Sequence, residues 1–461
     1  MRKPTDWIRP EIVFLAIAPL LGLACLTLTP PFHVADEPEH FFRIVQIAEG
    51  HLLGERRGTE SGGHVPAALS ELADYYVDGN PVSGEVRWDR RKWAAIYPHL
   101  TQRAEGGGRV FRDFRGMNLY APAVYVPQVV GVGVVRALNL PPLWLVYAGR
   151  FCALAAFVGL VFWAIRLTPV CPWGFAVLAL LPATISQAAS LSADSLTNAL
   201  LFFFAAWVFR CVYAKDRIAR KDLVGMLMLG VGIGLCKSAY ILSLGLIFLI
   251  PPAKFGGRKR YWIASGGVAG TALLVAALWS AAASATYVPL FDDVDAWAQA
   301  VYILSHPLHF AGMVLVRLLH AVRFLFLGER IGLLQEFVGA LGWNTVYVNI
   351  GQTSLAVLFW CAIAEKNEKV GICEWHRWGV AAILAGTILM IAAANYMVWC
   401  PPGAPALALF GRYFHPIAPM ALLLLHNRSF VVRCAEKWRV LIPAYFVGVA
   451  VATVYVIGHA Y

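Results

Sequence analysis

The chain has 461 residues, of which 59% are apolar and only 14% carry a charge. A soluble domain carries about a quarter charged residues, so this composition excludes a soluble multidomain protein, a disordered chain and a fibrous one. The formal net charge of +11 is better explained by loops that face the cytoplasm and anionic lipid headgroups than by nucleic acid, which is not an expected partner. We predict an all-α polytopic membrane protein.

Apolar runs that approach the length of a bilayer crossing occur along most of the chain. They lie at 11–29, 143–165, 171–188, 196–213, 223–252, 262–282, 346–364, 378–398, 412–426 and 439–458. The run 223–252 has Lys237 near its middle, which predicts two short helices with a turn at that lysine. Counting this run twice, we expect about eleven transmembrane helices. Pro30 and Pro31 replace a small-residue cleavage site after the first run, which favours an uncleaved helix over a signal peptide.

The distribution of Lys and Arg between the connections predicts the orientation in the membrane. These residues gather at 1–9, 210–222, 254–260, 366–377 and 428–439, whereas 189–195, 283–307 and 399–411 have none. Basic connections mark the cytoplasmic side, so we predict a multi-pass protein with a cytoplasmic N-terminus. The alternation holds only if 118–138 does not cross the membrane, and we expect a bent interfacial or re-entrant element there. The segment 308–343 is equally ambiguous.

Residues 30–116 form a large outer loop that contains thirteen of the 27 acidic residues. Within it, apolar residues from Phe41 to Leu53 recur at helical spacing, with Arg43, Gln46 and Glu49 on the other side. This pattern predicts a short amphipathic helix on the membrane surface. Asp36 and Glu37 precede it, where a carboxylate is either a simple helix cap or a group that contacts a lipid headgroup.

Several motifs follow one another along the chain. They are Pro-Pro-Phe-His-Val-Ala-Asp-Glu-Pro-Glu-His-Phe-Phe-Arg at 30–43, Tyr120-x-Pro122 with Tyr125, Ser-Ala-Asp-Ser-Leu-Thr-Asn at 192–198, Gly-Trp at 342–343 and Gly-Arg-Tyr-Phe-His-Pro at 411–416. In this order they resemble a bacterial membrane-protein family catalogued as domain of unknown function 2142. That family is similar in layout to the GT-C superfamily of glycosyltransferases, multi-spanning enzymes that use a polyprenyl-phosphate-linked sugar on the outer face.

The resemblance implies a GT-C-like helix bundle in the bacterial cytoplasmic (inner) membrane. Its partners would be a polyprenyl-phosphate-linked sugar, membrane lipids and an envelope glycan or lipid acceptor. The organisation that we expect is a tail and first helix (1–29), an extracytoplasmic loop with interfacial elements (30–142), core helices (143–282), a second extracytoplasmic segment (283–345) and C-terminal helices (346–461).

Such a transfer needs a base for the acceptor hydroxyl and positive charge for the departing phosphate. Asp36 is the candidate general base, with Glu37 as its alternate or an orienting partner. His40 is a candidate ligand for phosphate or acceptor, or only a hydrogen-bonding histidine on the helix face. Arg43 is expected to pair with an acidic neighbour or with the carrier phosphate.

Further candidates lie later in the chain. Asp194 is either a substrate or metal contact or only the N-cap or a first-turn charge of its helix, and Asn198 follows one turn later. Lys237, with Tyr240 nearby, either contacts phosphate or snorkels to the interface. Arg412, beside Tyr413 and His415, suits phosphate oxygens because its guanidinium is planar.

Two interpretations and two structural roles remain open. The alternative to a transferase is a lipid or polysaccharide transporter, whose ionisable residues would line a pathway. Paired carboxylates leave the use of a divalent metal, Mg²⁺ or Mn²⁺, undecided. Arg150, inside an apolar helix, is expected to pair with a buried carboxylate or with backbone carbonyls. The Gly-x-Gly-x-Gly motif at 230–234 is better explained by close helix packing than by nucleotide binding.

Overall fold

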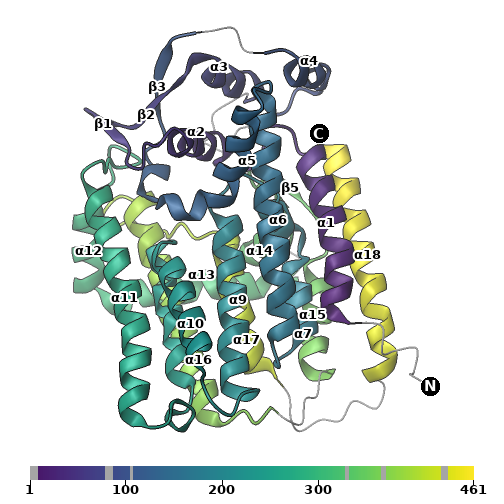
Figure 1. Ribbon diagram of the computed structural model, residues 1–461, viewed down its shortest axis with the longest axis vertical. Helices are drawn as coiled ribbons and strands as arrows, with labels where there is room; N and C mark the ends of the chain where they lie inside the picture. The colour runs from purple at the N-terminus through teal and green to yellow at the C-terminus, as the bar shows by residue number, and fades with distance from the viewer. Residues whose placement is uncertain (1–8, 78–86, 104–106, 328–331, 365–369, 427–434) are drawn as a thin grey trace.

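The computed structural model describes residues 9–77, 87–103, 107–327, 332–364, 370–426 and 435–461. Long helices run side by side to form a bundle, and a small sheet with several short helices covers one end of it (Figure 1). We call the part made by 30–116 the loop region. The prediction of a mostly helical protein is confirmed, and the sheet in the loop region is an addition to it.

Six helices in the described residues are long and apolar enough to cross a membrane. They are α1 (Pro10–Leu28), α6 (Leu143–Leu167), α9 (Asp194–Tyr213), α11 (Arg258–Ser284), α16 (Glu374–Trp399) and α18 (Ala435–Ala460), the last through its 441–460 part. The bent pair α12 (Ala296–Ser305) and α13 (Pro307–Leu327), whose halves meet at 99°, would make a seventh. The predicted count of about eleven is therefore not confirmed.

The number of membrane-spanning helices is smaller than predicted because some apolar segments are buried inside the bundle. The run 171–188 is split into α7 (Pro172–Ala179) and α8 (Pro182–Ala188), because Pro182 cannot continue a helix that comes before it. Nearly every residue of both pieces is buried. A segment enclosed by other helices is as apolar as a transmembrane helix, but it does not have to be long enough to cross the bilayer.

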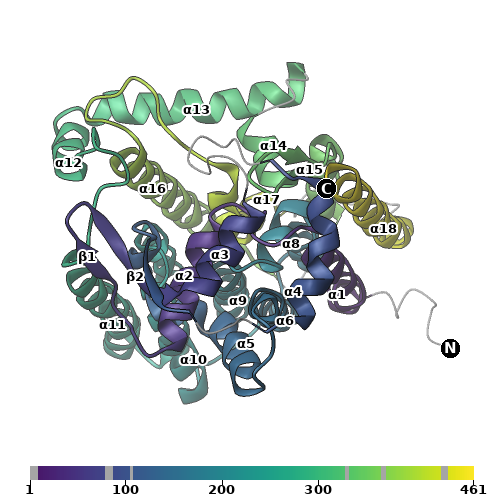
Figure 2. The same ribbon diagram turned by 90° about the horizontal axis from the view of Figure 1, so that it is seen from above.

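Other predicted spans are also short. They are α15 (Gly351–Ala364) and the pair formed by the 3₁₀ helix η7 (Gly411–Ile417) and α17 (Ala418–Leu425). The predicted non-crossing element at 118–138 contains the 3₁₀ helices η3 (Met117–Leu119) and η4 (Pro122–Tyr125) and the helix α5 (Val126–Ala137), which packs along α6. Helix α13 lies across the direction of the bundle in both views (Figures 1 and 2).

The predicted break at Lys237 is confirmed. Helix α10 (Arg220–Gly234) ends before it, and a 3₁₀ helix, η5 (Ser238–Leu249), follows. The glycines before the break allow α10 to lie against α11: a Cβ on Gly234 would stand 2.5 Å from the carbonyl oxygen of Ala272, and one on Gly230 would stand 2.9 Å from Val268. Close packing is therefore the role of the Gly-x-Gly-x-Gly motif.

The loop region builds its own small core over the end of the bundle. Its elements are α2 (Glu37–Ala48), β1 (Glu55–Arg57), β2 (Glu60–Pro66), α3 (Ala67–Tyr76), the 3₁₀ helix η2 (Arg90–Ala95), α4 (Ile96–Thr101) and β3 (Arg109–Asp113). The three strands form an antiparallel sheet in the order β1-β2-β3. Helix α2 lies beneath this layer, with Arg43 and Gln46 0% and 2% exposed. The prediction of a surface helix with these two residues outward is wrong, because the sheet covers that face.

The remaining elements connect the bundle. They are the 3₁₀ helix η6 (Pro252–Phe255), α14 (Leu333–Gly339), and the paired two-residue strands β4 (Ala340–Leu341) and β5 (Val346–Tyr347). The first and last long helices, α1 and α18, lie side by side at one edge (Figures 1 and 2).

The described basic turns lie away from the loop region. The α9–α10 turn and the stretch before α11 are at the opposite end of the bundle (Figure 1), which agrees with a segregation of positive charge. The basic residues at 1–8, 366–369 and 428–433 lie outside the described residues. The orientation of the N-terminus stays a prediction.

Candidate functional site

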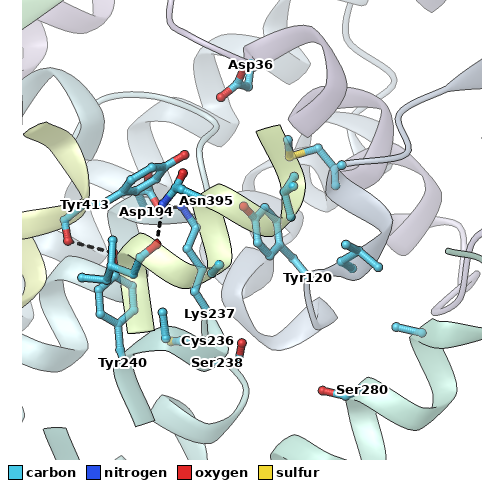
Figure 3. A pocket seen from close by; sticks show the side chains of 18 of the residues that line it. Asp36, Tyr120, Asp194, Cys236, Lys237, Ser238, Tyr240, Ser280, Asn395 and Tyr413 are labelled. Atoms are coloured by element: carbon cyan, nitrogen blue, oxygen red, sulfur yellow. Dashed lines mark hydrogen bonds and ion pairs between the residues drawn. The ribbon is translucent and has the colours of Figure 1, made fainter. Parts of the chain in front are cut away.

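A cavity of about 500 Å³ lies where the loop region meets the bundle. Segments that are far apart in the sequence line it: the start of α2, the start of α9, the α10–η5 junction, the C-terminal ends of α11 and α16, and η7. The lining includes seven polar or ionisable side chains that could take part in chemistry: Asp36, Glu39, His40, Asp194, Lys237, Arg412 and Tyr413. Figure 3 shows Asp36 on one side of the space, with Asp194, Lys237 and Tyr413 gathered on another.

Asp36 is held by Arg412, which is 376 positions away in the chain. Arg412 Nη2 donates to Asp36 Oδ2 at 2.7 Å. Asp36 occupies the position before α2, but its side chain makes no capping hydrogen bond, and its backbone is left-handed with φ 62°. Non-glycine residues adopt that region rarely, with Asp among the more tolerant. The simple cap is therefore not what this carboxylate does in the structure.

The electrostatics of Asp36 follow from the cations around it. Burial alone would raise the pKa of this carboxyl, but the positive charges of Arg412 and Lys237 help bring it below its ordinary value. Opposite charges at hydrogen-bond distance favour the ionised form in this way. Asp36 is thus an ionised carboxylate that forms an ion pair with Arg412.

A second ion pair, between Asp194 and Lys237, joins α9 to the break after α10. Lys237 Nζ lies 2.6 Å from Asp194 Oδ1 (Figure 3). The ammonium also stands over two aromatic rings, 4.6 Å from the centre of Tyr413 and 5.4 Å from that of Tyr120. Cation–π contacts add to the stabilisation of a buried cation. Asp194 is the first residue of α9 and an acidic residue of its first turn, not its N-cap. Lys237 does not snorkel away from the site.

Tyr240 and Tyr413 support this arrangement. Both side chains line the cavity. The hydroxyl of Tyr240 donates to the backbone carbonyl of Tyr413 at 3.1 Å (Figure 3). The Arg412 guanidinium lies 5.3 Å from the ring of Tyr413. The two tyrosines thus position η7 and, with it, the arginine that reaches Asp36.

Glu37 lies outside the cavity, in the core. Its carboxylate and the guanidinium of Arg150 are both 0% exposed and form a two-point ion pair at 2.5 and 2.8 Å. Glu37 also accepts from the backbone N–H of Leu191 at 3.2 Å. Arg150 donates further to the carbonyls of Leu26, Thr29 and Pro30. The predicted partner classes of Arg150 are confirmed, and the pair ties α1, α2 and α6 together.

His40 and Arg43, one turn apart on α2, have different surroundings. His40 lines the cavity, shares a hydrogen bond of 2.8 Å between Nδ1 and the hydroxyl of Tyr125, and has its pKa lowered to about 4 by burial. It is neutral at pH 7. Arg43 donates to Gln46 Oε1 and to the carbonyl of Leu52. It does not line the cavity, so its observed contacts hold the loop region together.

Asn198 and His415 meet at a third residue. The amide of Asn198 donates to Gln187 Oε1 at 3.2 Å, and His415 Nδ1 lies 3.1 Å from the same oxygen. His415 Nε2 is also 2.6 Å from the carbonyl of Phe337. Neither residue lines the cavity, so both belong to a polar network in the packing behind it.

Glu39 and Tyr120 belong to the site, although no role was predicted for them from the sequence. Glu39 lines the cavity from α2, and Tyr120 lies beneath Lys237. A signal for Glu39 was present: positions 36, 39 and 40 share one face of a helix that starts at 37. Nothing in the sequence alone separates Glu39 from Glu37, which the same helix directs into the core.

The described residues contain no group of three or more His, Cys, Asp and Glu side chains placed to hold a metal ion. In the cavity, Asp36 and Asp194 each face a cation instead of each other. The side chains present therefore do not fit a divalent ion bound by converging carboxylates.

Comparison with known proteins gives one match. The model of a family described as "Predicted membrane protein (DUF2142)" matches residues 20–421, the greater part of the chain. The matched range includes every charged residue of the cavity. The chain matches no curated protein and no solved structure.

Proposed function

This chain belongs to the DUF2142 family of predicted membrane proteins, and from the chemistry of its cavity we propose that it is an integral-membrane glycosyltransferase. The proposed reaction moves a sugar from a polyprenyl-phosphate donor to a glycan or lipid acceptor of the cell envelope, on the extracytoplasmic side of a bacterial cytoplasmic membrane. The observation that carries the proposal is that two paired cations and an apolar wall of membrane helices share one cavity.

The apolar wall suits the lipid part of such a donor. It is formed by α11 and α16, with Ala276 and Trp279 from the first and Ile391 and Val398 from the second. Both helices are apolar and long enough to cross a membrane. A polyprenyl chain is apolar throughout and is charged only at its phosphate, so a cavity that combines a membrane-helix wall with cations matches it.

The cations suit the phosphate part. Arg412 offers a planar fork of donors, which matches phosphate oxygens, and Lys237 offers a point charge. Asp36 and Asp194 compensate these cations, so neither positive charge is buried without a partner. A bound phosphate would share the two cations with the aspartates and would be stabilised further as it leaves.

The remaining requirement is a proton acceptor for the attacking hydroxyl. A carboxylate at the start of α2 would supply it, a contribution of about 10²–10⁴-fold to the rate. The sequence places this role at Asp36 with Glu37 as alternate. Glu37 is committed to Arg150 in the core, which leaves the cavity-facing residues of α2.

Broken helices favour a second candidate function, a transporter of lipid or polysaccharide. Transporter sites often lie at discontinuous helices, and the break between α10 and η5 carries Lys237. The two functions differ in chemistry. A transporter would carry the lipid-linked sugar across the membrane intact, whereas a transferase breaks the bond between sugar and phosphate.

A donor-consumption assay tests the proposal. Polyprenyl-phosphate sugars are extracted from cells that lack this chain and are incubated with acceptor membranes and the purified chain in lipid nanodiscs. We expect free polyprenyl phosphate to appear together with a sugar-extended glycan or lipid. Asp36→Asn, which removes the counter-charge of Arg412, should lower the yield of both products at low donor concentration. Movement of intact donor across a vesicle bilayer without cleavage would favour the transporter and overturn the transferase.

A further inference from the structure

Glu39 differs from the other two carboxylates that line the described cavity. Asp36 and Asp194 each have a cation at 2.7 and 2.6 Å. Glu39 has no hydrogen bond or ion pair to any residue that the structure describes, although its side chain faces the cavity. It is therefore the carboxylate whose lone pairs are available to a ligand.

We infer that Glu39, and not Asp36, is the general base of the proposed transfer, while Asp36 holds Arg412 in place for the donor phosphate. This assignment rests on the proposed function and deepens it. Protonation of Asp36 would remove the negative charge that pairs with Arg412. Glu39 has no such ion pair to lose among the described residues.

The surroundings of Glu39 fit a proton acceptor. Burial, followed by the negative charges of Asp36 and Asp113, raises the pKa of this carboxyl to about 8, and Arg115 opposes the shift. A base works best when its pKa lies near the working pH. Asp36, whose pKa lies below its ordinary value, is ionised but weakly basic.

Gly116 is the neighbour of Glu39 on this side of the cavity. Gly116 also lines the cavity, and a Cβ added there would stand 3.8 Å from Glu39 Oε2. This side of the cavity is formed by the loop region, whereas the apolar wall is formed by α11 and α16. A polar acceptor hydroxyl would then approach Glu39 from the loop region, with the donor lipid on the wall formed by α11 and α16.

The step balances without another reactant. The acceptor oxygen forms a bond to the anomeric carbon as its proton passes to a Glu39 carboxylate oxygen. The bond from the anomeric carbon to the phosphate oxygen breaks, and its electron pair leaves with the phosphate. Arg412 and Lys237 stabilise the second negative charge that the phosphate gains when this bond breaks. Glu39 returns to its ionised form when it releases the proton to water.

Initial rates of transfer from pH 6 to pH 9 test the inference with the whole chain in nanodiscs. The variants are Glu39→Gln, Glu39→Asp and, as a control, Glu71→Gln on the exposed face of α3. The donor probe is the polyprenyl-phosphate sugar fraction described above. We expect Glu39→Gln to lower kcat by about 10²–10⁴-fold and to leave the donor KM within about threefold. Wild type should gain activity as the pH rises toward 8, and Glu39→Gln should lose this dependence.

Further variants distinguish a failure of this inference from a failure of the proposed function on which it rests. Glu39→Asp should retain part of the activity with a shifted pH profile, which a purely structural role would not produce. Asp36→Asn should raise the donor KM and keep the pH dependence. The inference is overturned if Glu39→Gln transfers sugar at the wild-type rate, or if Asp36→Asn is the variant that loses the pH dependence. No transfer by the wild-type chain would overturn the proposed function itself.

Discussion

Asp36 and Glu37 are adjacent in the chain, yet their carboxylates lie in opposite surroundings. Asp36 reaches the cavity and binds Arg412, whereas Glu37 is fully buried against Arg150. The left-handed backbone at Asp36, with φ 62°, starts α2 at the residue that follows it. One carboxylate thus belongs to the site and its neighbour to the scaffold, and substitutions at the two positions should have different consequences.

The substitution Asp36→Asn tests the site half of this relationship. Asn tolerates the left-handed conformation, so the backbone should be retained, but Arg412 loses its counter-charge. We expect at least a tenfold fall in transfer at low donor concentration, the cost of about 1.4 kcal/mol or more in binding. The measurement is the donor dependence of the initial rate. Asp293→Asn, in an exposed turn, should be indistinguishable from wild type, and an equally small effect of Asp36→Asn would contradict the prediction.

The substitution Glu37→Gln tests the scaffold half. Removing one partner of a buried ion pair leaves the other charge uncompensated, at a cost of about 3–5 kcal/mol. We expect a marked fall in the unfolding temperature of the purified chain in detergent. Asp74→Asn provides the comparison, because the Asp74–Arg112 pair is half exposed and such pairs contribute about 1 kcal/mol or less. Equal effects of the two substitutions would contradict the role of Glu37 in the core.

A double variant separates charge compensation from ligand binding at Lys237. Lys237→Met alone leaves Asp194 buried beside an apolar side chain, so we expect both stability and transfer to fall. Adding Asp194→Asn removes the orphaned charge and should restore most of the unfolding temperature. Transfer should stay at least tenfold below wild type, because the phosphate has lost a cation. Recovery of transfer in the double variant would show that Lys237 acts only through Asp194.

Several parts of the site could be predicted from the sequence because they carry strong local signals. A lysine in an apolar run predicted the break at 237, and a charged residue in a membrane helix predicted a buried partner for Arg150. The candidates Asp36, Asp194, Lys237 and Arg412 come together in one cavity. Their expected roles as ligands of a donor stay predictions.

Other features depend on tertiary packing that no local pattern encodes. The sheet over α2 buries Arg43 and Gln46, although helical spacing places them opposite the apolar face. Hydropathy cannot separate a segment enclosed by the bundle, such as α7 and α8, from a lipid-facing span, since both exclude charge. Asp36 pairs with Arg412 and Glu37 with Arg150 because the backbone at Asp36 is left-handed. The residue type at position 36 does not predict that conformation.

The pH dependence of stability gives a test of Glu39 that does not require the substrate. Its pKa is raised from the ordinary value of 4.5 to about 8 in the folded chain, so between these values the folded state binds more protons than the unfolded state. Stability that the protonated carboxyl provides is therefore lost as the pH rises through about 8. Glu39→Gln keeps a neutral side chain at every pH and should escape this loss. We expect the variant to match wild type near pH 5 and to be more stable by up to about 5 kcal/mol at pH 8.5, since each unit of pKa shift corresponds to about 1.4 kcal/mol. Unfolding temperatures in detergent at both pH values measure the difference, with Glu71→Gln as the control. A difference that stays constant with pH would mean that folding does not raise the pKa of Glu39, and would contradict the prediction.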